Sequence, residues 1–435
     1  MKNYLLEHVF VVKRNELKKF LILFLIGNLS IFNFIMLRLL KDTFIISNLG
    51  AASIPVVKLF YVLPASIFFM FLYTKLANYF DGRSLFIIFV SIFGIAFLLY
   101  TLFFINFKDS ITYYIFYTLA ESWGTVTLGT AMWAYFNDIC TISQAKRFYV
   151  LVSGVQIGSI VASIVAESFV SIFGSKFYST AALYSIIGAC FLIIILTIIF
   201  KDILKKEIEI EEKVNEPLEE RRSIFRGIQL VFTSKYLFLI FFITLCYNFT
   251  MIVVEFIWKS NLGLAYPNEE KLIIFNSRYS FWTTIISAVV SVFFSAGFIN
   301  YLGITTALIL FPMVFGISTS FYFFNFVTPI GGAVQWVVSK TAKYAFSDPA
   351  KQVLFIPCNT EEKYKAKSVI DIFGARGGKA IASLFNMIFL SHIGDFYKRA
   401  NVSYPIIMFI ILLWIMASLV VGMTFNKLEK LEKQK

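Results

Sequence analysis

The sequence is poor in the residues from which most metal sites and nucleophilic sites are built. Its 435 residues include only 4 cysteines and 2 histidines, which are spread along the chain: Cys140, Cys190, Cys246, Cys358, His8 and His392. This spacing does not assemble a zinc site or a Cys/His nucleophile. We therefore expect no metal, no cofactor and no catalytic residue, and we do not expect an enzyme.

Charged residues are also scarce, and their scarcity leaves long hydrophobic runs. Charged residues make up 15% of the chain, whereas hydrophobic residues make up 59% and aromatic residues 18%, which excludes an ordinary soluble domain. Crossing the hydrocarbon core of a bilayer takes ~20 apolar residues. The runs predict an all-α polytopic membrane protein with twelve transmembrane helices. The predicted spans are 19–40, 56–79, 84–107, 112–136, 148–172, 179–200, 236–258, 275–299, 302–323, 325–344, 368–392 and 405–425.

The basic residues are distributed unevenly between the two sides of these spans. With both termini in the cytoplasm, 27 of the 39 Lys and Arg residues lie at cytoplasmic ends, 10 at the opposite ends and 2 inside the eleventh span. Positive residues favour the cytoplasmic side, so the formal net charge of +13 reflects topology and not a nucleic-acid partner. We expect no cleavable signal peptide, because the charged stretch Met1–Lys19 leads directly into a full span. The bilayer is the expected environment, and no protein partner is evident.

The hydrophobic pattern divides the chain into two halves of six spans. Residues 1–200 form the first half, 201–235 a charged cytoplasmic linker and 236–435 the second half. Gly154 and Gly158 at the start of the fifth span recur 220 residues later as Gly374 and Gly378 in the eleventh. Parallel repeats of six helices with substrate held between them are the plan of major-facilitator transporters. The sequence therefore predicts a 6+6 major-facilitator-like arrangement with pseudo-twofold halves, although small residues at this spacing also serve plain helix packing.

Seven of the charged residues within or directly beside the predicted spans are candidate site residues. They are Lys41, Glu121, Glu255, Lys259, Arg278, Arg376 and Lys379, five basic and two acidic. Charges in a membrane are costly and usually line a pathway or a substrate site. The basic excess predicts a cavity for a multiply charged anion, in which Arg and Lys contact phosphate. The alternative is a set of ion pairs that lock the helices together.

The geometry of these residues can be partly anticipated. Glu255 and Lys259 are four residues apart and are expected to form an ion pair on one helix face. Arg376 and Lys379 are three apart and also share a face. Glu121, in mid-span, needs a cation or a proton, because an unpaired buried carboxylate is very costly.

Several runs resemble the nucleotide transporter (ATP/ADP translocase) family of obligate intracellular bacteria and plastids. The resemblance extends from about residue 20 to 390, in order and spacing. The matching runs are Leu39–Gly50, Val57–Leu59 with Pro64, Leu119–Gly124, Ala145–Tyr149, Phe232–Tyr236, Val254–Ser260, Ser339–Asp348, Ile356–Pro357 and Lys365–Lys367, followed by Arg376 and Lys379.

This resemblance implies a twelve-helix carrier in the bacterial inner membrane that exchanges ATP for ADP or takes up a related nucleotide by alternating access. The family's four transport-critical charges fall on Lys41, Glu121, Glu255 and Lys379. Glu121 and Glu255 are then expected to balance the cavity charge. Departures from the family pattern at Ser122, Arg278 and Ala380–Ala382 put strict ATP/ADP exchange in doubt.

Other functions stay open on the sequence alone. A major-facilitator carrier for another organic anion shares the same plan, and one for sugars or drugs does not need five basic cavity residues. An intramembrane enzyme would need a nucleophile or a metal cluster. Tyr61, Trp123 and Trp258 are candidates for stacking on a base, with lipid contact as the alternative.

Overall fold

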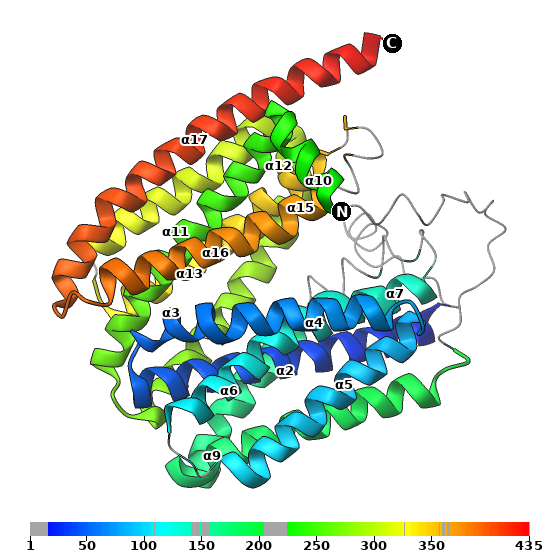
Figure 1. Cartoon of the computed structure of the whole chain (residues 1–435), viewed down its shortest axis with the longest axis vertical. Coiled ribbons are helices and arrows are strands. Elements are labelled where there is room, and N and C mark those ends of the chain that lie inside the picture. Colours follow the sequence, from blue (N-terminus) through cyan, green and yellow to red (C-terminus); the bar gives the residue numbers. More distant parts are fainter. Residues whose placement is uncertain are drawn as a thin grey trace. The chain divides into compact units, whose positions relative to one another are not determined.

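The computed structural model is helical throughout the part that it describes, and no strand occurs there. It describes residues 16–105, 107, 109–140, 144, 148, 156–203, 224–325, 327–355, 357, 358, 362 and 366–434. Most of the predicted linker, the start of the fifth span including Gly154, and most of the 145–149 run lie outside these residues. The chain groups into two compact units (Figure 1). The predicted all-α fold is confirmed.

The first unit comprises residues 1–50, 60–211 and 266–284. Its described helices are α2 (Leu17–Leu49), α4 (Leu63–Leu76), α5 (Gly82–Leu99), the π-helical segment η2 (Tyr100–Phe104), α6 (Ser110–Ser122), the π-helical segment η3 (Trp123–Ala131), α7 (Met132–Ile139) and α9 (Ile157–Ile199). The N-terminal part of α12 (Glu269–Asn325) also belongs to it. α9 packs along α2 and α5 (Figure 1). Phe93, Phe97, Phe116 and Trp123 form an aromatic core in which ring centroids lie 6.0–6.5 Å apart.

The second unit comprises residues 51–59, 212–265 and 285–435. Its helices are α3 (Ser53–Val57), α10 (Ile224–Thr233), α11 (Lys235–Ala265), the rest of α12, α13 (Pro329–Ala342), η5 (Lys343–Ser347), α14 (Asp348–Val353), α15 (Lys367–Val369), η7 (Ile370–Gly374), α16 (Ala375–Phe385), η8 (Asn386–Leu390) and α17 (Phe396–Gln434). The short π-helical segment η1 (Lys58–Val62) crosses the boundary between the units. α11 packs against both α16 and α17, and the three helices lie side by side in Figure 1.

The two units repeat one helix contact. A Cβ on Gly158 would overlap the backbone oxygen of Asn28, and a Cβ on Gly378 would meet Leu245 O at 2.8 Å and Asn248 Cβ at 2.9 Å. Asn28 and Asn248 are themselves 220 residues apart, the spacing that separates the two glycines. Each asparagine Nδ2 donates to the carbonyl four residues earlier on its own helix. The predicted internal repeat is therefore present as equivalent glycine–asparagine contacts.

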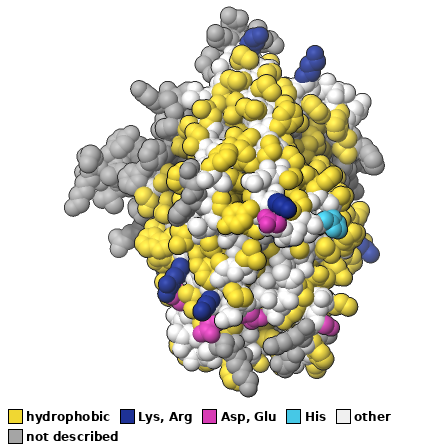
Figure 2. All heavy atoms as spheres, turned by 90° about the vertical axis from the view of Figure 1, so that its left-hand side faces the viewer, with side chains coloured by type: hydrophobic (Ala, Val, Ile, Leu, Met, Phe, Trp, Pro, Cys, Tyr) yellow, Lys and Arg dark blue, Asp and Glu magenta, His cyan; other side chains and the backbone are white. Residues whose placement is uncertain are grey.

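Long apolar helices account for most of the described chain. Eight of the described helices, or segments of them, are long and apolar enough to cross a membrane: Leu17–Leu49, Ser53–Leu76, Gly82–Phe103, Ile157–Gly174, Phe177–Ile199, Lys235–Ala265, Gly303–Phe324 and Phe396–Leu428. α9 and α12 each contain two successive predicted spans, separated by sharp turns at Gly174 and Gly303, whose φ of 66° and 76° only glycine adopts readily. Figure 2 shows one face covered largely by hydrophobic side chains.

The other four predicted spans are helical but are not long and apolar enough to be counted among these eight. They are 112–136, 275–299, 325–344 and 368–392. The first and last are divided by π-helical segments, and α13 has only 14 residues. The count of twelve stays a prediction, and so do the domain boundaries at residues 200 and 236.

Candidate functional site

One buried charge cluster lies in the first unit, at the C-terminal part of α2. The Lys41 ammonium is 2.9 Å from Glu121 Oε1 and 3.0 Å from Asp42 Oδ1, and its side chain is 7% exposed. It also lies 4.1 Å from the centre of the Tyr117 ring, within range of a cation–π interaction. Glu121 thus has the cation that a mid-span carboxylate requires.

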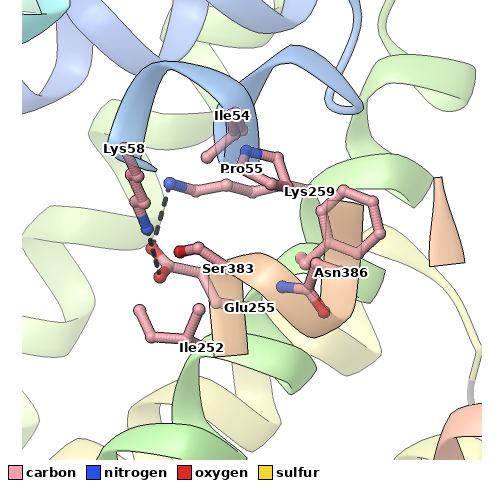
Figure 3. Close-up of a pocket in the computed structure, with 9 residues that line it drawn as sticks. Ile54, Pro55, Lys58, Ile252, Glu255, Lys259, Ser383 and Asn386 are labelled. Carbon is pink, nitrogen blue, oxygen red and sulfur yellow. Dashed lines mark hydrogen bonds and ion pairs between the residues drawn. The ribbon is translucent and has the colours of Figure 1, made fainter. Parts of the chain in front are cut away.

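A second cluster lies in the second unit, and in it one carboxylate is paired with two lysines. Glu255 on α11 accepts from two ammonium groups: Lys259 lies 2.9 Å from Oε1, and Lys58 lies 3.4 Å from Oε2 (Figure 3). The side chains of Lys259, Glu255 and Lys58 are 4%, 10% and 17% exposed. The predicted ion pair between Glu255 and Lys259 is confirmed.

This second cluster borders a small pocket. It is lined by Ile54, Pro55, Lys58, Ile252, Glu255, Phe256, Lys259, Ser383 and Asn386, and its cavity volume is about 10 Å³. Three segments supply the polar groups: Lys58 follows α3, Glu255 and Lys259 lie on α11, and Ser383 and Asn386 lie at the end of α16 and the start of η8 (Figure 3).

π-helical segments recur beside the charged residues. η1 begins at Lys58, η3 begins two residues after Glu121, and η7 and η8 flank α16, which carries Arg376 and Lys379. Wide turns of this kind are uncommon and are frequent at functional sites, because they shift the direction of side chains relative to a regular helix. The membrane helices are thus locally irregular where the charges lie.

Arg376 and Lys379 on α16 differ from the other predicted site residues. Arg376 is half-buried and Lys379 is exposed. Within the described part of the chain neither cation has an ion pair or a hydrogen bond, whereas the side chains of Lys41, Lys259 and Arg278 each pair with a carboxylate. These two cations are available to an anionic ligand without displacing a carboxylate.

Arg278 belongs to a separate site in the first unit. Its Nη2 and Nε lie 2.7 Å and 2.9 Å from Glu167 Oε1, and the two side chains are 67% and 36% exposed. The pair borders a pocket with a cavity volume of about 280 Å³, which is lined by Ser163, Ile164, Glu167, Ser277, Arg278, Phe281 and Trp282. Arg278 lies near the start of its predicted span (275–299) and Glu167 near the end of its own (148–172), so this exposed ion pair belongs to the ends of the predicted spans.

Sequence reasoning missed three charged residues of these sites: Asp42, which directly follows the predicted site residue Lys41, and Lys58 and Glu167. Lys58 and Glu167 both lie inside predicted spans, so the signal that identified the other seven residues was present for them too. The stacking role is not supported for two of the three aromatic residues. Trp123 and Trp258 are 0% and 3% exposed, and their indole N–H groups donate to Ser30 O and Pro329 O, so both are packing residues within their units.

The fold is similar to that of solved transporters of low sequence identity. The nucleoside transporter NupG aligns with 93% of this chain and 99% of its own at a TM-score of 0.59 and 14% identity. A D-xylose–proton symporter aligns with 93% of this chain and 96% of its own at a TM-score of 0.62 and 12% identity. Together with the helical halves, these similarities show that the chain has a major-facilitator-type fold.

Comparison at the sequence level is more specific. ADP,ATP carrier protein 1 of Chlamydia trachomatis is 28% identical over 468 residues, which cover 93% of this chain and 88% of the relative. ADP,ATP carrier protein 3 of Rickettsia conorii is 28% identical over 475 residues, which cover 94% of this chain and 95% of the relative. The model of the TLC ATP/ADP transporter family matches residues 2–112, 103–331 and 326–425. The chain belongs to this family, which confirms the resemblance drawn from its sequence motifs.

Proposed function

We propose that the protein carries nucleotides across the membrane by alternating access, exchanging ATP for ADP or taking up a related nucleotide. The observation that carries this proposal is the pair of cations on α16, Arg376 and Lys379, which have no partner among the described residues. A planar guanidinium and a compact ammonium on one helix face match the oxygens of a phosphate chain. The similarity to ADP,ATP carriers over nearly the full chain supports the same substrate class.

The paired charges have a complementary role in this proposal. In the empty carrier, Glu121 and Glu255 balance Lys41 and Lys259, because an unpaired buried charge is costly. When phosphate enters, its oxygens take over part of this balance and the carboxylates are released. Substrate and carboxylate therefore compete for the same lysines, so that the empty and loaded carriers are both free of unbalanced charge.

In this mechanism the nucleotide is the transported substrate, and it is released without any chemical change. We therefore infer that the protein is not an enzyme. Uptake of labelled nucleotides into liposomes that contain the purified protein, with and without internal counter-substrate, tests the function and separates exchange from net uptake. Nucleoside di- and triphosphates are expected to compete far better than the free nucleoside. Equal competition by adenosine and ATP, or by their guanine counterparts, would contradict phosphate recognition.

We further propose that the protein lies in the bacterial inner membrane with both termini in the cytoplasm. The asymmetry of Lys and Arg between the two ends of the predicted spans supports this orientation. On a cysteine-free background, a single cysteine at position 401 should react with an impermeant reagent added to intact cells. A single cysteine at position 215 should not, and its labelling from outside would reverse the proposed topology.

A further inference from the structure

A polar stripe on one side of α16 leads into the pocket beside Glu255. Arg376, Lys379, Ser383 and Asn386 follow one another at spacings of three, four and three residues, which places them on one helix face. The two ends of the stripe differ in exposure: Arg376 is half-buried and Lys379 exposed, whereas Ser383 is 2% and Asn386 1% exposed. The stripe therefore connects the two unpartnered cations with the buried pocket.

The pocket contains a polar group without a partner of its own. The Asn386 side chain lines the pocket, and its Oδ1 has no hydrogen-bond partner. In Figure 3 the amide nitrogen of Asn386 lies on the side of Ser383, and its oxygen points away from Lys58 and Lys259. An amide Oδ1 only accepts hydrogen bonds, so this atom calls for a donor, whereas the Nδ2 of the same carboxamide is the group that can donate to an anionic oxygen. Ser383 places a hydroxyl in the same pocket.

The charges that border the pocket select an anion. Two ammonium groups, from Lys58 and Lys259, face one carboxylate, from Glu255. The contact of Lys58 is longer, 3.4 Å against 2.9 Å, and Lys58 is the most exposed of the three side chains. Charge-assisted hydrogen bonds are strongest at about 2.7–2.9 Å, so Lys58 gives up its contact with Glu255 more readily than Lys259 does.

The size of the pocket limits the ligand to part of a nucleotide. Its cavity volume of about 10 Å³ is far below the ~300–1,000 Å³ of pockets that enclose a whole small molecule, so a single ligand group enters it only when Lys58 moves away from Glu255. We propose that this pocket receives the terminal phosphoryl group, that Lys58 contacts this group directly, and that Lys58, Ser383 and Asn386 determine how many phosphates the carrier prefers. The inference rests on the proposed function and extends it to substrate selection within that class.

The first test is Lys58→Gln in the full-length protein, reconstituted in liposomes. Inhibition constants for a nucleoside mono-, di- and triphosphate of the same base are measured against labelled substrate. Loss of one charge-assisted contact should raise the constant for the preferred, longer nucleotide about tenfold to a hundredfold. The constant for the monophosphate, which does not reach the pocket, should stay at the wild-type value.

Two further variants provide a control and an independent test of the same pocket. Lys351→Gln serves as the matched control, because Lys351 is a partly buried lysine of the same unit that pairs with Asp371 at 2.7 Å, outside the pocket. It should leave the selectivity unchanged. Asn386→Asp keeps the shape of the side chain but adds a negative charge, and should weaken binding of the longer nucleotide even if Lys58→Gln does not fold.

The outcomes separate this inference from the proposed function. If the wild type transports nucleotides but Lys58→Gln changes all three inhibition constants by the same factor, the pocket does not determine the preferred number of phosphates. The same holds if Asn386→Asp raises the melting temperature and leaves the selectivity unchanged, since the pocket is then a structural ion cluster. If the wild type transports no nucleotide, the proposed function itself is wrong.

Discussion

In the first unit one lysine, Lys41, faces two carboxylates, whereas in the second unit one carboxylate, Glu255, faces two lysines. Both clusters are largely buried and both involve residues that the sequence had singled out. They differ in net charge: the paired side chains of the first cluster include one more carboxylate than ammonium groups, and those of the second include one more ammonium group than carboxylates. The first cluster surrounds its lysine with carboxylates, and the second presents more ammonium groups than its carboxylate can pair at short distance.

This difference assigns different roles to the two units. A lysine held by Asp42, Glu121 and the face of Tyr117 is restrained in the empty protein. The second unit also carries Arg376 and Lys379, so its charges favour an arriving phosphate chain. On the proposed function, we therefore expect phosphate recognition to depend more on the second unit, and Lys41 to become available only when a carboxylate releases it.

The largest expected effect is on stability, and it comes from removing Lys41. Lys41→Met leaves Asp42 and Glu121 without this ammonium, and breaking a buried pair in this way costs about 3–5 kcal/mol. Lys259→Met leaves Glu255 with Lys58, so its cost should be smaller. Thermal unfolding of the purified proteins measures both changes. Equal losses of stability would remove the distinction between the two clusters.

Loss of Lys379 should affect transport more than stability. Lys379→Ala removes an exposed cation without an ion pair among the described residues, so the melting temperature should stay near the wild-type value. A charge-assisted contact with phosphate is worth ~1.5–3 kcal/mol, so transport efficiency should fall tenfold to a hundredfold. Added nucleotide should stabilise the wild type more than the variant. If the variant instead unfolds, and a second change at Glu121 or Glu255 restores it, Lys379 is a structural partner.

Neutralising the carboxylates should separate the two clusters by their effect on binding. Glu255→Gln leaves Lys58 and Lys259 with no carboxylate from their own cluster, so the empty carrier should lose about 1–3 kcal/mol of stability and bind nucleotide more tightly. Glu121→Gln leaves Lys41 with Asp42 and should change affinity less. Dissociation constants from ligand titration, read beside the melting temperatures, check this ordering. Tighter binding in Glu121→Gln than in Glu255→Gln would contradict it.

The smallest expected difference concerns the repeated helix contact. A Cβ at either glycine meets backbone or asparagine atoms, and overpacking of this kind typically costs about 1–3 kcal/mol. Gly158→Ala should cost more than Gly378→Ala, because the new Cβ falls directly on the Asn28 carbonyl. Gly188→Ala is a suitable control, since a Cβ there meets nothing within 4 Å. Melting temperatures that follow the reverse order would show that the two contacts are not equivalent.

Much of this molecule could be anticipated because membrane helices leave strong signals. The hydrophobic runs predicted helices at every described span, and the 220-residue repeat of Gly158 and Gly378 predicted equivalent packing in both halves. The ion pair between Glu255 and Lys259 followed from a spacing of four residues on one helix. In each case the relevant interaction is local in sequence or set by burial alone.

The partners that lie far apart in the sequence could not be assigned in the same way. The sequence by itself determined which positions within the spans carry a charge. Each such charge opposes membrane insertion, so its presence indicates a structural or functional role. Only the tertiary structure decided which of them meet: Lys41 with Glu121, Lys58 with Glu255, and Glu167 with Arg278. These pairs depend on the rotation of one packed helix against another, which a single chain's pattern of residue types does not encode. The same packing buries Trp123 and Trp258, because the space that a large side chain fills is set by the neighbouring helices.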